Sequence, residues 1–361
     1  MEINDIDDSL MTPRRISAVD LFCGAGGLTY GLKSAGINVK AGIDIDLASK
    51  YPFEFNNKSE FLPFDIKNIK AEQLQKYFDR DSYSLLAGCA PCQPFSSYAG
   101  ARDTTKDPRW TLLLEFKRLI HDLKPDFVTM ENVPRLAGHT VFDDFLDSLV
   151  ALKYYVDYSV VACVHYGLPQ TRRRLVLVAS KHGSVRIPSP QKIPTQTVRQ
   201  AIEKLERLVA GEVSGNDPLH RARSLSELNL RRLRASKEGG NWHDWPEELL
   251  SPCHKKTGGQ SFRSVYSRME WDKPAPTITT EFYNFGTGRF GHPEQDRAIS
   301  LREAAILQGF PSHYRFTKPS EPISLVHVGR LIGNAVPPPL GEVIGSIFME
   351  HIGEGAANES R

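Results

Sequence analysis

Residues 16–27 read Ile-Ser-Ala-Val-Asp-Leu-Phe-Cys-Gly-Ala-Gly-Gly, an apolar run that ends in a cluster of glycines. The run predicts a buried strand over 17–22, and the residues that follow Gly27 have helical spacing. A glycine turn between a strand and a helix lets the backbone approach a ligand closely, because no Cβ atom stands in the way. This stretch therefore predicts the first strand, turn and helix of an α/β domain.

The same alternation of short apolar runs with amphipathic stretches extends from residue 16 to about residue 180. It predicts repeated strand–helix units and a mostly parallel sheet. The expected strands span 17–22, 39–43, 84–88, 127–130, 156–161 and 175–179.

Segment 188–194 ends this pattern, because its three prolines remove backbone donors and disfavour helix. We therefore place a domain boundary near residue 186, after a first domain over 1–185. Residues 186–320 are expected to form a smaller, loopier domain, and apolar helical spacing within 321–361 predicts a helix that packs back onto the first domain. A chain of 361 residues exceeds the size at which one hydrophobic core usually stops growing, which agrees with two domains.

Composition disfavours several classes of protein. The net charge is only +2, from 45 basic and 43 acidic side chains, so any surface for a polyanion must be local. The five cysteines are scattered and no charged and apolar leader opens the chain, which disfavours secretion and a disulfide framework. No apolar run approaches the roughly 20 residues that a membrane helix requires. We therefore expect a soluble, cytoplasmic protein without a membrane partner.

The glycine turn suits nucleotide binding but does not match the dinucleotide pattern. That pattern requires a third glycine where this chain has Thr29, so nicotinamide cofactors are disfavoured. Asp44 follows the second expected strand, 20 residues after Gly24, where a carboxylate can accept hydrogen bonds from ribose hydroxyls. Two simpler interpretations stay open: the glycines only close a tight turn, and Asp44 caps the next helix.

Segment 88–96, Gly-Cys-Ala-Pro-Cys-Gln-Pro-Phe-Ser, places a cysteine on a turn that two prolines stiffen. Cys92 is therefore a candidate nucleophile, and a thiol with an ordinary pKa of about 8.5 requires a positive or donor-rich setting to ionise at neutral pH. Cys89 and Cys92 also have Cys-x-x-Cys spacing. Because the other cysteines are solitary, we expect neither a zinc site nor a redox pair. Cys89 is instead expected to be a small core residue at the end of a strand.

Charged residues at two other strands complete this candidate site. Glu131 follows the apolar run 127–130, so it should emerge at the carboxyl end of a parallel strand, where open sheets bind ligands. Arg172 and Arg174 flank Arg173 just before a strand, so their side chains share one face. Together with Cys92 they predict a nucleophile, an acid and an anion clamp. The alternatives are that Glu131 caps a helix and that the arginines form a solvated charge run.

The smaller domain contains the local concentration of positive charge that the overall composition lacks. Its basic residues are His220, Arg221, Arg223, Arg231, Arg232, Arg234 and Lys237. The turn that follows, Gly-Gly-Asn-Trp at 239–242, adds polar and aromatic side chains suited to contacts in a DNA groove. A solvated helix face beside core tryptophans is an equally open interpretation.

Five short motifs occur in an order that resembles the cytosine-C5 DNA methyltransferase family over about residues 16–350. They lie at 20–27, 88–96, 130–133, 170–174 and, as Gly-Asn-Ala-Val-Pro, at 333–337. The resemblance implies a Rossmann-like, S-adenosylmethionine-dependent methyltransferase fold, in which the smaller domain recognises the target. It also implies that Cys92 attacks cytosine, that Glu131 hydrogen-bonds N3 of the base, and that Arg172 and Arg174 hold the base and the adjacent phosphate.

The resemblance assigns further residues to two ligands. The expected cofactor, S-adenosyl-L-methionine, would contact Phe22, Gly24, Gly26, Gly27, Asp44, Ile45, Asp65, Ile66, Asn334 and Ala335. Double-stranded DNA would contact Ser96, Arg102, Arg109, Arg231, Arg232, Arg234 and Trp242. Ile45 departs mildly from the family, since some members have an aromatic residue there. No metal is expected.

The resemblance therefore implies methyl transfer to C5 of a cytosine in a specific short DNA site, through a covalent bond between Cys92 and C6 of a flipped-out base. The expected setting is a monomeric restriction-modification methylase, with a cognate endonuclease as a possible partner. Two alternatives stay open. One is a transfer-RNA cytosine-5 methyltransferase, although this chain lacks the Cys-Phe-Thr motif typical of that branch. The other is a DNA-binding relative without turnover.

Overall fold

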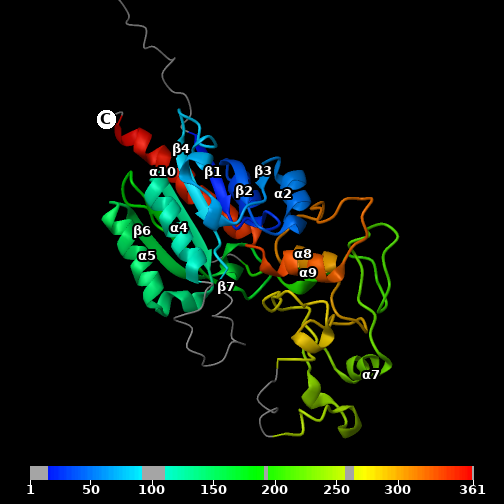
Figure 1. Ribbon diagram of the computed structural model, residues 1–361. Coiled ribbons are helices and arrows are strands. Elements are labelled where there is room, and N and C mark those ends of the chain that lie inside the picture. The colour runs from blue at the N-terminus through cyan, green and yellow to red at the C-terminus, as the bar shows by residue number, and fades with distance from the viewer. Residues whose placement is uncertain (1–14, 92–109, 191–193, 257–263, 360–361) are drawn as a thin grey trace, which may run out of the picture.

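The computed structural model describes residues 15–91, 110–190, 194–256 and 264–359. Its centre is a seven-stranded sheet with the order β3-β2-β1-β4-β5-β7-β6 (Figure 1). The strands are β1 (Ile16–Leu21), β2 (Asn38–Ile43), β3 (Glu60–Leu62), β4 (Tyr83–Gly88), β5 (Phe127–Asn132), β6 (Tyr155–Ala162) and β7 (Arg173–Ser180). Strands β1 to β5 pair in parallel, whereas β7 runs antiparallel to both β5 and β6. The predicted α/β fold with a mostly parallel sheet is thus confirmed.

Helices connect the strands and continue beyond the sheet. The α-helices are α1 (Gly27–Ser34), α2 (Lys50–Asn57), α3 (Ala71–Gln75), α4 (Trp110–Leu123), α5 (Thr140–Ala151), α6 (Val198–Ile202), α7 (Glu227–Ala235), α8 (Leu301–Leu307), α9 (Leu325–Asn334) and α10 (Pro338–Glu359). Single 3-10 turns are η2 (Leu47–Ser49), η3 (Ile66–Asn68), η5 (Pro134–Gly138), η6 (Cys163–Tyr166), η7 (Trp242–Asp244), η8 (Glu247–Leu249) and η9 (Phe285–Thr287). None of the helices in the described ranges is long and apolar enough to cross a membrane.

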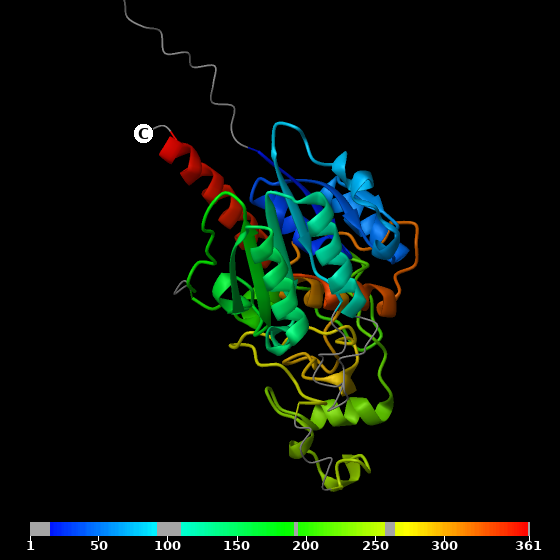
Figure 2. The ribbon, with the colours of Figure 1, turned by 60° about the vertical axis from the view of Figure 1, so that its left-hand side comes forward.

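Helices cover both faces of the sheet, because its central strands are apolar on both sides. Along β1, Ala18 packs toward α1 and α10, whereas the next residue, Val19, packs toward α4 and α5. Phe116 of α4 is fully buried on one face and Phe348 of α10 on the other. Figures 1 and 2 show the resulting three layers, with α4 and α5 opposite α10.

Helix α10 lies directly on α1, and glycines allow this contact. A Cβ atom added to Gly31 of α1 would lie 2.2 Å from the carbonyl oxygen of Pro338, and one added to Gly341 would lie 2.8 Å from the carbonyl oxygen of Leu28. Both distances are too short for a real Cβ atom, so the two helix backbones approach closely only because these positions lack side chains. The apolar helical spacing after Pro338 predicted this helix correctly.

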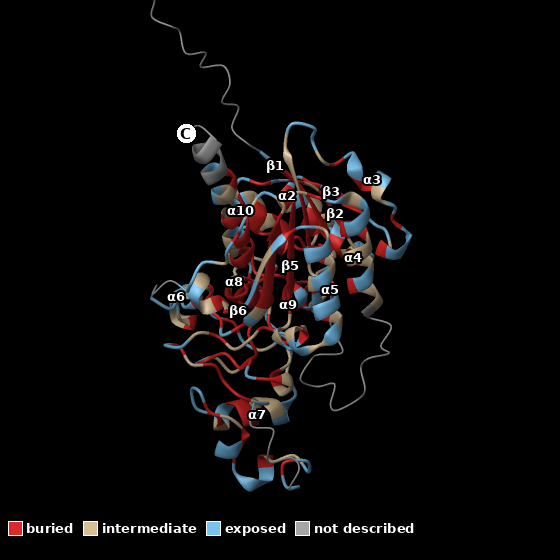
Figure 3. Cartoon of the chain, turned by 90° about the vertical axis from the view of Figure 1, so that its left-hand side faces the viewer, coloured by how far each residue is buried: buried red, intermediate tan, exposed pale blue. Residues whose placement is uncertain are grey.

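The part of the chain between α6 and α8 has few regular elements and extends below the sheet in Figures 1 and 2. Its larger apolar cluster includes Phe282 and Phe310, and it reaches α9 and Ala25 of the glycine turn. A smaller cluster surrounds Trp242 and Trp245 beside α7. Buried residues are continuous through the sheet, α8 and α9 and become sparser toward α7 (Figure 3). The apolar packing of this region is thus continuous with the turn after β1, at the carboxyl ends of the parallel strands.

Candidate active site

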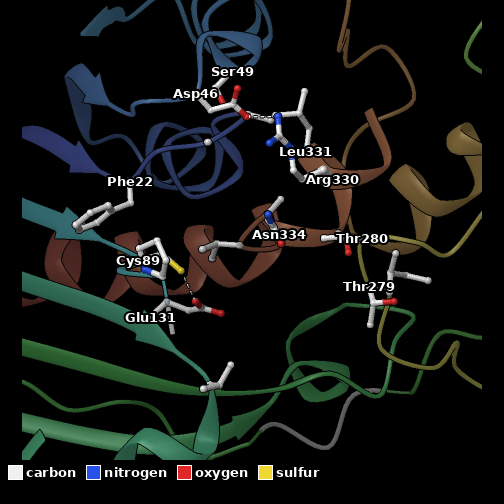
Figure 4. Close-up of a pocket in the computed structure, with 18 of the residues that line it drawn as sticks. Phe22, Asp46, Ser49, Cys89, Glu131, Thr279, Thr280, Arg330, Leu331 and Asn334 are labelled. Atoms are coloured by element: carbon white, nitrogen blue, oxygen red, sulfur yellow. Dashed lines mark hydrogen bonds and ion pairs between the residues drawn. The ribbon is translucent and has the colours of Figure 1, made fainter. Parts of the chain in front are cut away.

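A cavity of about 1260 Å³ lies at the carboxyl ends of the parallel strands, between the sheet and the region around α9. Its walls come from loops after β1, β2, β3, β4 and β5, from β7, and from residues 264–265, 276–281, 286–290, 330–331 and 333–336. Small-molecule pockets usually measure about 300–1,000 Å³, so this volume exceeds that of a site for one small ligand. Figure 4 shows side chains from these separate segments pointing into the same space.

The glycine turn after β1 is held to the end of β2 by a hydrogen bond. Gly24 has a φ of +50°, and its N–H donates to Asp44 Oδ2 at 2.9 Å. Gly24 lines the cavity, but Gly26 and Gly27 are not among the lining residues. Instead, Gly26 has a φ of +89° before α1, and a Cβ atom on Gly27 would lie 2.2 Å from the carbonyl oxygen of Val336. The last two glycines are therefore required by the turn and its packing.

Asp44 does not cap the helix that follows it. Its Oδ1 accepts a hydrogen bond from Asp46 N at 2.9 Å, and it is Asp46 that caps η2 by accepting from Ala48 N at 3.1 Å. Asp46 also forms an ion pair of 2.6 Å with Arg330 of α9 (Figure 4). Burial raises the pKa of Asp44 above its ordinary value. Each oxygen of Asp44 accepts one backbone N–H, which leaves acceptor capacity toward the cavity.

Apolar side chains lie open in this part of the cavity. Ile45 is 71% exposed and Phe64 is 46% exposed, yet both line the cavity wall, together with Phe22 and the buried Ile66. Asp65 also lines it, and its Oδ1 caps η3 by accepting from Lys67 N at 3.1 Å. Exposed apolar walls beside carboxylates suit a ligand that combines a flat apolar ring with hydroxyl groups.

Asp20 is a site residue that the sequence analysis missed. Its side chain is buried and lines the cavity, and Thr29 Oγ1 donates to its Oδ2 at 2.7 Å. Its Oδ1 has no hydrogen-bond partner among the described residues. Burial, opposed in part by Thr29, raises the pKa of Asp20 to about 7. A buried acid with a free oxygen is a partner for a cationic or hydrogen-bond-donating group in the cavity.

Glu131 stands at the end of β5, as predicted, and is almost completely buried. Its Oε2 accepts a hydrogen bond from Cys89 Sγ at 2.9 Å, and its Oε1 lies 2.8 Å from Arg174 Nε. The contact with Arg174 is not aligned as a hydrogen bond, so Oε1 has no hydrogen-bond partner in the described part of the chain. Glu131 is therefore a residue of the cavity and not the cap of a helix.

Arg172 and Arg174 share one face, as the alternation predicted, while Arg173 between them is exposed. Strand β7 begins at Arg173, so the side chain of Arg174 lies beside β5, its antiparallel neighbour. Arg172 is buried, and its Nε has no hydrogen-bond partner among the described residues. Burial and the nearby Arg174 lower the pKa of Arg172 to about 9, which still leaves it charged at neutral pH. These arginines are internal residues that line the cavity and not a solvated run.

A buried chain of hydrogen bonds links Arg172 to the other side of the cavity. Arg172 Nη1 donates to the carbonyl oxygen of Ile278 at 3.2 Å, and Ile278 N donates to Gln170 Oε1 at 3.1 Å. Gln170 Nε2 donates to Gln308 Oε1 and Gln308 Nε2 donates to the carbonyl oxygen of Ala335, each at 2.8 Å. Ala335 and its neighbour Asn334 line the cavity. Gln170 and Gln308 therefore hold the segments around Ile278 and Ala335 in place, although these segments are distant in sequence.

Four predicted residues lie outside the described ranges, namely Cys92, Ser96, Arg102 and Arg109. The segment that leads to them is described. Cys89, Ala90 and Pro91, the three residues before Cys92, all line the cavity near Glu131. Pro91, the residue directly before the predicted nucleophile Cys92, therefore lies in the cavity wall.

The structure corrects two of the residues predicted to contact DNA. Arg232 is buried and donates to the carbonyl oxygen of Leu249 at 2.9 Å and to Ser251 Oγ at 2.7 Å. Trp242 is buried and stacks on His254, with ring centroids 4.2 Å apart. Both side chains fill the interior of the region around α7 and are not available at its surface.

The other two predicted DNA contacts on α7 are exposed. Arg231 points to solvent, and Arg234 is 58% exposed, with Asp296 3.4 Å and Glu227 3.7 Å from its guanidinium. Of the candidates on this helix, Arg231 and Arg234 therefore keep the accessibility that a DNA contact requires.

The chain is similar in sequence and fold to known proteins. The model of the C-5 cytosine-specific DNA methylase family matches residues 16–349. Type II methylase M.HgiDII of Herpetosiphon aurantiacus is 48% identical over 333 residues, which cover 91% of this chain and 93% of that protein. Type II methyltransferase M.Sau96I of Staphylococcus aureus is 30% identical over 344 residues, covering 93% and 76%. The solved structure of a prophage-encoded DNA modification methyltransferase from E. coli superposes with a TM-score of 0.73 at 23% identity, covering 94% of this chain and 99% of that one.

Proposed function

The chain belongs to the C-5 cytosine-specific DNA methylase family and is a DNA cytosine-5-methyltransferase of the type II restriction-modification kind, and from this premise we propose how its cavity carries out the reaction. The cavity receives a flipped-out cytosine from a short, specific duplex site beside the carboxylate of Glu131. Cys92 is the nucleophile, and Arg172 and Arg174 hold the base and its phosphate. A cognate endonuclease would recognise the same site.

The chemistry requires a covalent step because C5 of cytosine is a weak nucleophile. The Cys92 thiolate adds to C6, which moves electron density to C5, and a hydrogen bond from Glu131 to N3 stabilises the charge that develops on the ring. Once C5 carries the methyl group, whose donor would leave as a neutral thioether, a water molecule takes the C5 proton, and the electron pair of that bond expels the Cys92 thiolate from C6. This elimination restores the aromatic base and the free enzyme. Extrusion of the base from the duplex costs a few kcal/mol, which contacts with the enzyme must offset.

The residues on the β1–β2 side of the cavity fit S-adenosyl-L-methionine, which would supply the methyl group. Asp44 has acceptor capacity for ribose hydroxyls, and the exposed side chains of Ile45 and Phe64 offer an apolar surface for the adenine. The free Oδ1 of Asp20 offers an acceptor for a positively charged group. Phe22, Gly24, Asp65, Ile66, Asn334 and Ala335 are the remaining lining residues that we assign to this ligand.

One observation carries the proposal: a single cavity joins the glycine turn and Asp44 to Glu131, Arg172 and the turn that leads to Cys92. A methyl donor and an acceptor base must lie next to each other for transfer to occur, because reacting atoms have to approach within about 3–3.5 Å. The volume of about 1260 Å³ is large enough for both ligands.

Methylation of a bacterial genome tests the proposal directly. Wild-type, Cys92→Ser and Glu131→Gln proteins would be expressed in a host without cytosine methylation, and protected cytosines would be mapped by bisulfite sequencing. We expect the wild type to protect one cytosine in one short motif, Cys92→Ser to protect none, and Glu131→Gln to protect at least a hundredfold fewer sites at matched expression. Cys253→Ser is the matched control, because Cys253 is exposed and is not a lining residue. Unchanged protection by Cys92→Ser would refute the covalent route.

A further inference from the structure

The register of the sheet brings a second cysteine to the proposed acid. Strands β4 and β5 pair in parallel with Gly88 opposite Met130, so the next residues, Cys89 and Glu131, lie together at the carboxyl edge. Cys89 Sγ donates a hydrogen bond of 2.9 Å to Glu131 Oε2, and the two side chains point toward each other in Figure 4. Cys89 was expected to be a core residue, but its side chain also lines the cavity. The thiol therefore belongs to the site.

The backbone that carries Cys89 is held independently of the thiol. Asn132, the residue after Glu131, donates from Nδ2 to the carbonyl oxygen of Ala90 at 3.1 Å in a buried hydrogen bond. Its Oδ1 accepts from Val133 N at 2.8 Å, which fixes the orientation of the amide. Two consecutive residues of β5 thus hold two consecutive residues of the turn after β4. The thiol consequently has little freedom to move away from the carboxyl group.

The carboxyl group of Glu131 is held from two sides. Cys89 contacts Oε2 from the turn after β4, and the guanidinium of Arg174 contacts Oε1 from β7 at 2.8 Å. The pair with Arg174 lacks hydrogen-bond alignment, so it holds Oε1 by charge attraction rather than by a hydrogen bond. Among the described residues, the thiol therefore makes the hydrogen bond that orients the carboxyl group of Glu131, because a hydrogen bond is directional and weakens steeply when its angle departs from linearity.

We propose that Cys89 is a positioning residue for methyl transfer: its thiol fixes the rotation of the Glu131 carboxyl group and keeps Oε1 directed at the target base. This inference rests on the proposed role of Glu131. In this role Cys89 acts through the carboxyl group of Glu131 and not on the base itself. Its contribution lies in the orientation of the acid before the substrate arrives, which matters because a misplaced catalytic group costs rate rather than binding.

The experiment is single-turnover methylation of duplex DNA, with the rate constant and the apparent Kd for DNA and for cofactor measured separately. We expect Cys89→Ala to lower the rate constant about tenfold, which is the effect of losing one ordinary hydrogen bond that orients the acid, and to leave both Kd values unchanged. Cys89→Ser keeps a donor of similar size, so we expect it to restore the rate to within about threefold of wild type. Cys253→Ala controls for loss of a thiol elsewhere, since that cysteine is exposed.

The outcomes separate this inference from the proposal on which it rests. If Glu131→Gln abolishes transfer but Cys89→Ala retains the full rate, the positioning role is wrong and the proposed function stands. If Glu131→Gln retains the full rate, the role of Glu131 fails first. Weaker binding of both ligands by Cys89→Ala, without rescue by Cys89→Ser, indicates a merely structural residue and overturns the inference. Thermal unfolding of each variant excludes misfolding. If the alanine variant is unstable, Cys89→Val, which fills a similar volume without a hydrogen-bond donor, carries the test and should lose the rate as alanine does.

Discussion

The sheet and the region between α6 and α8 meet at one cavity, but they satisfy their buried polar groups by different means. In the sheet, the strands satisfy one another's backbone groups, and the interior between sheet and helices is apolar. In the other region regular elements are short, and arginine side chains bind backbone carbonyl groups instead. Arg268, for example, donates to the carbonyl oxygens of Leu233, Ser236, His292 and Gln295. The same residue type that marks a DNA surface elsewhere is therefore an internal component here.

This difference teaches how to interpret a basic run. A buried carbonyl group without a partner costs about 1–3 kcal/mol, and a loop-rich region has many of them. The guanidinium has five donors in a rigid plane, so one buried arginine can satisfy several carbonyl groups at once. Predictions about the sheet should therefore follow from apolar packing and from its edge residues, whereas the stability of the second region should depend on individual charged side chains.

The largest expected effect comes from breaking the buried ion pair at α8. Arg297 is fully buried and binds both oxygens of Glu303, at 2.7 and 2.6 Å. Burial opposes the charge of Glu303, but Arg297 lowers its pKa to about 2. Arg297→Met would leave this carboxylate buried and unpaired, so we expect the free energy of unfolding to fall by about 3–5 kcal/mol in urea denaturation.

A double variant distinguishes the loss of the pair from the loss of packing. Arg297→Met with Glu303→Gln removes both charges and keeps an acceptor for Ser300 N, which Glu303 Oε2 binds at 2.7 Å. We expect it to recover at least half of the stability that Arg297→Met loses, because a pair replaced on both sides leaves no uncompensated charge. A loss below about 1 kcal/mol in the single variant would show that the region does not depend on its buried charges.

The second effect belongs to the sheet and depends on pH. Burial raises the pKa of Asp20 from an ordinary 3.8 to about 7, so the folded protein binds this proton more tightly than the unfolded chain. The stabilisation is complete below about pH 4 and is lost as the pH rises to about 7, with a slope of at most about 1.4 kcal/mol per pH unit. Asp20→Asn stays neutral, and we expect its thermal midpoint to decline less over this window than that of the wild type. Asp81→Asn, an exposed position, is the control and should follow the wild type.

Sequence reasoning succeeded where local patterns determine position. Apolar runs located six of the strands, and the rule that ligands lie at the carboxyl ends of parallel strands placed Asp44 and Glu131 on the cavity. Strand β3 was missed because its three residues, Glu60–Leu62, are too few for a pattern. The antiparallel direction of β7 was not predicted either, because direction depends on how the chain returns to the sheet and not on the residues of the strand.

The remaining failures concern contacts between distant segments. Cys89 packs against the core, as expected, but its position opposite β5 also brings its thiol to Glu131, which was not predicted. Arg232 and Trp242 were assigned to DNA because charge and aromatic character are visible in a sequence, whereas burial is not. Asp20 was overlooked because nothing local indicates that one of its oxygens lacks a partner. The role of each of these residues depends on its neighbours in the folded chain. Tertiary packing determines those neighbours, and the local sequence does not show them.

A third prediction concerns the two neighbouring arginines of α7, which the comparison assigns to opposite roles. Arg232 binds Leu249, Asn229 and Ser251, and its guanidinium lies 5.1 Å from the ring centroid of Trp245. Arg232→Ala should therefore lower the free energy of unfolding by about 2–3 kcal/mol, since the buried carbonyl of Leu249 and the partly buried acceptors on Asn229 and Ser251 lose their donor. DNA affinity measured below the unfolding transition should keep the same dependence on salt. A normal stability of Arg232→Ala would contradict its role as an internal donor.

The smallest expected change in stability is that of Arg231→Ala, one residue away. Arg231 is exposed and has no ion-pair partner in the part of the chain that the structure describes, so its removal should change the free energy of unfolding by less than about 0.5 kcal/mol. If Arg231 contacts a DNA phosphate, the slope of log affinity against log salt should become less steep by about 0.9. Titrations of a cognate duplex at several salt concentrations measure this slope for wild type, Arg231→Ala and Arg232→Ala side by side. A changed slope for Arg232→Ala but not for Arg231→Ala would reverse the assignment, because the buried side chain would then be the one that reaches the phosphate.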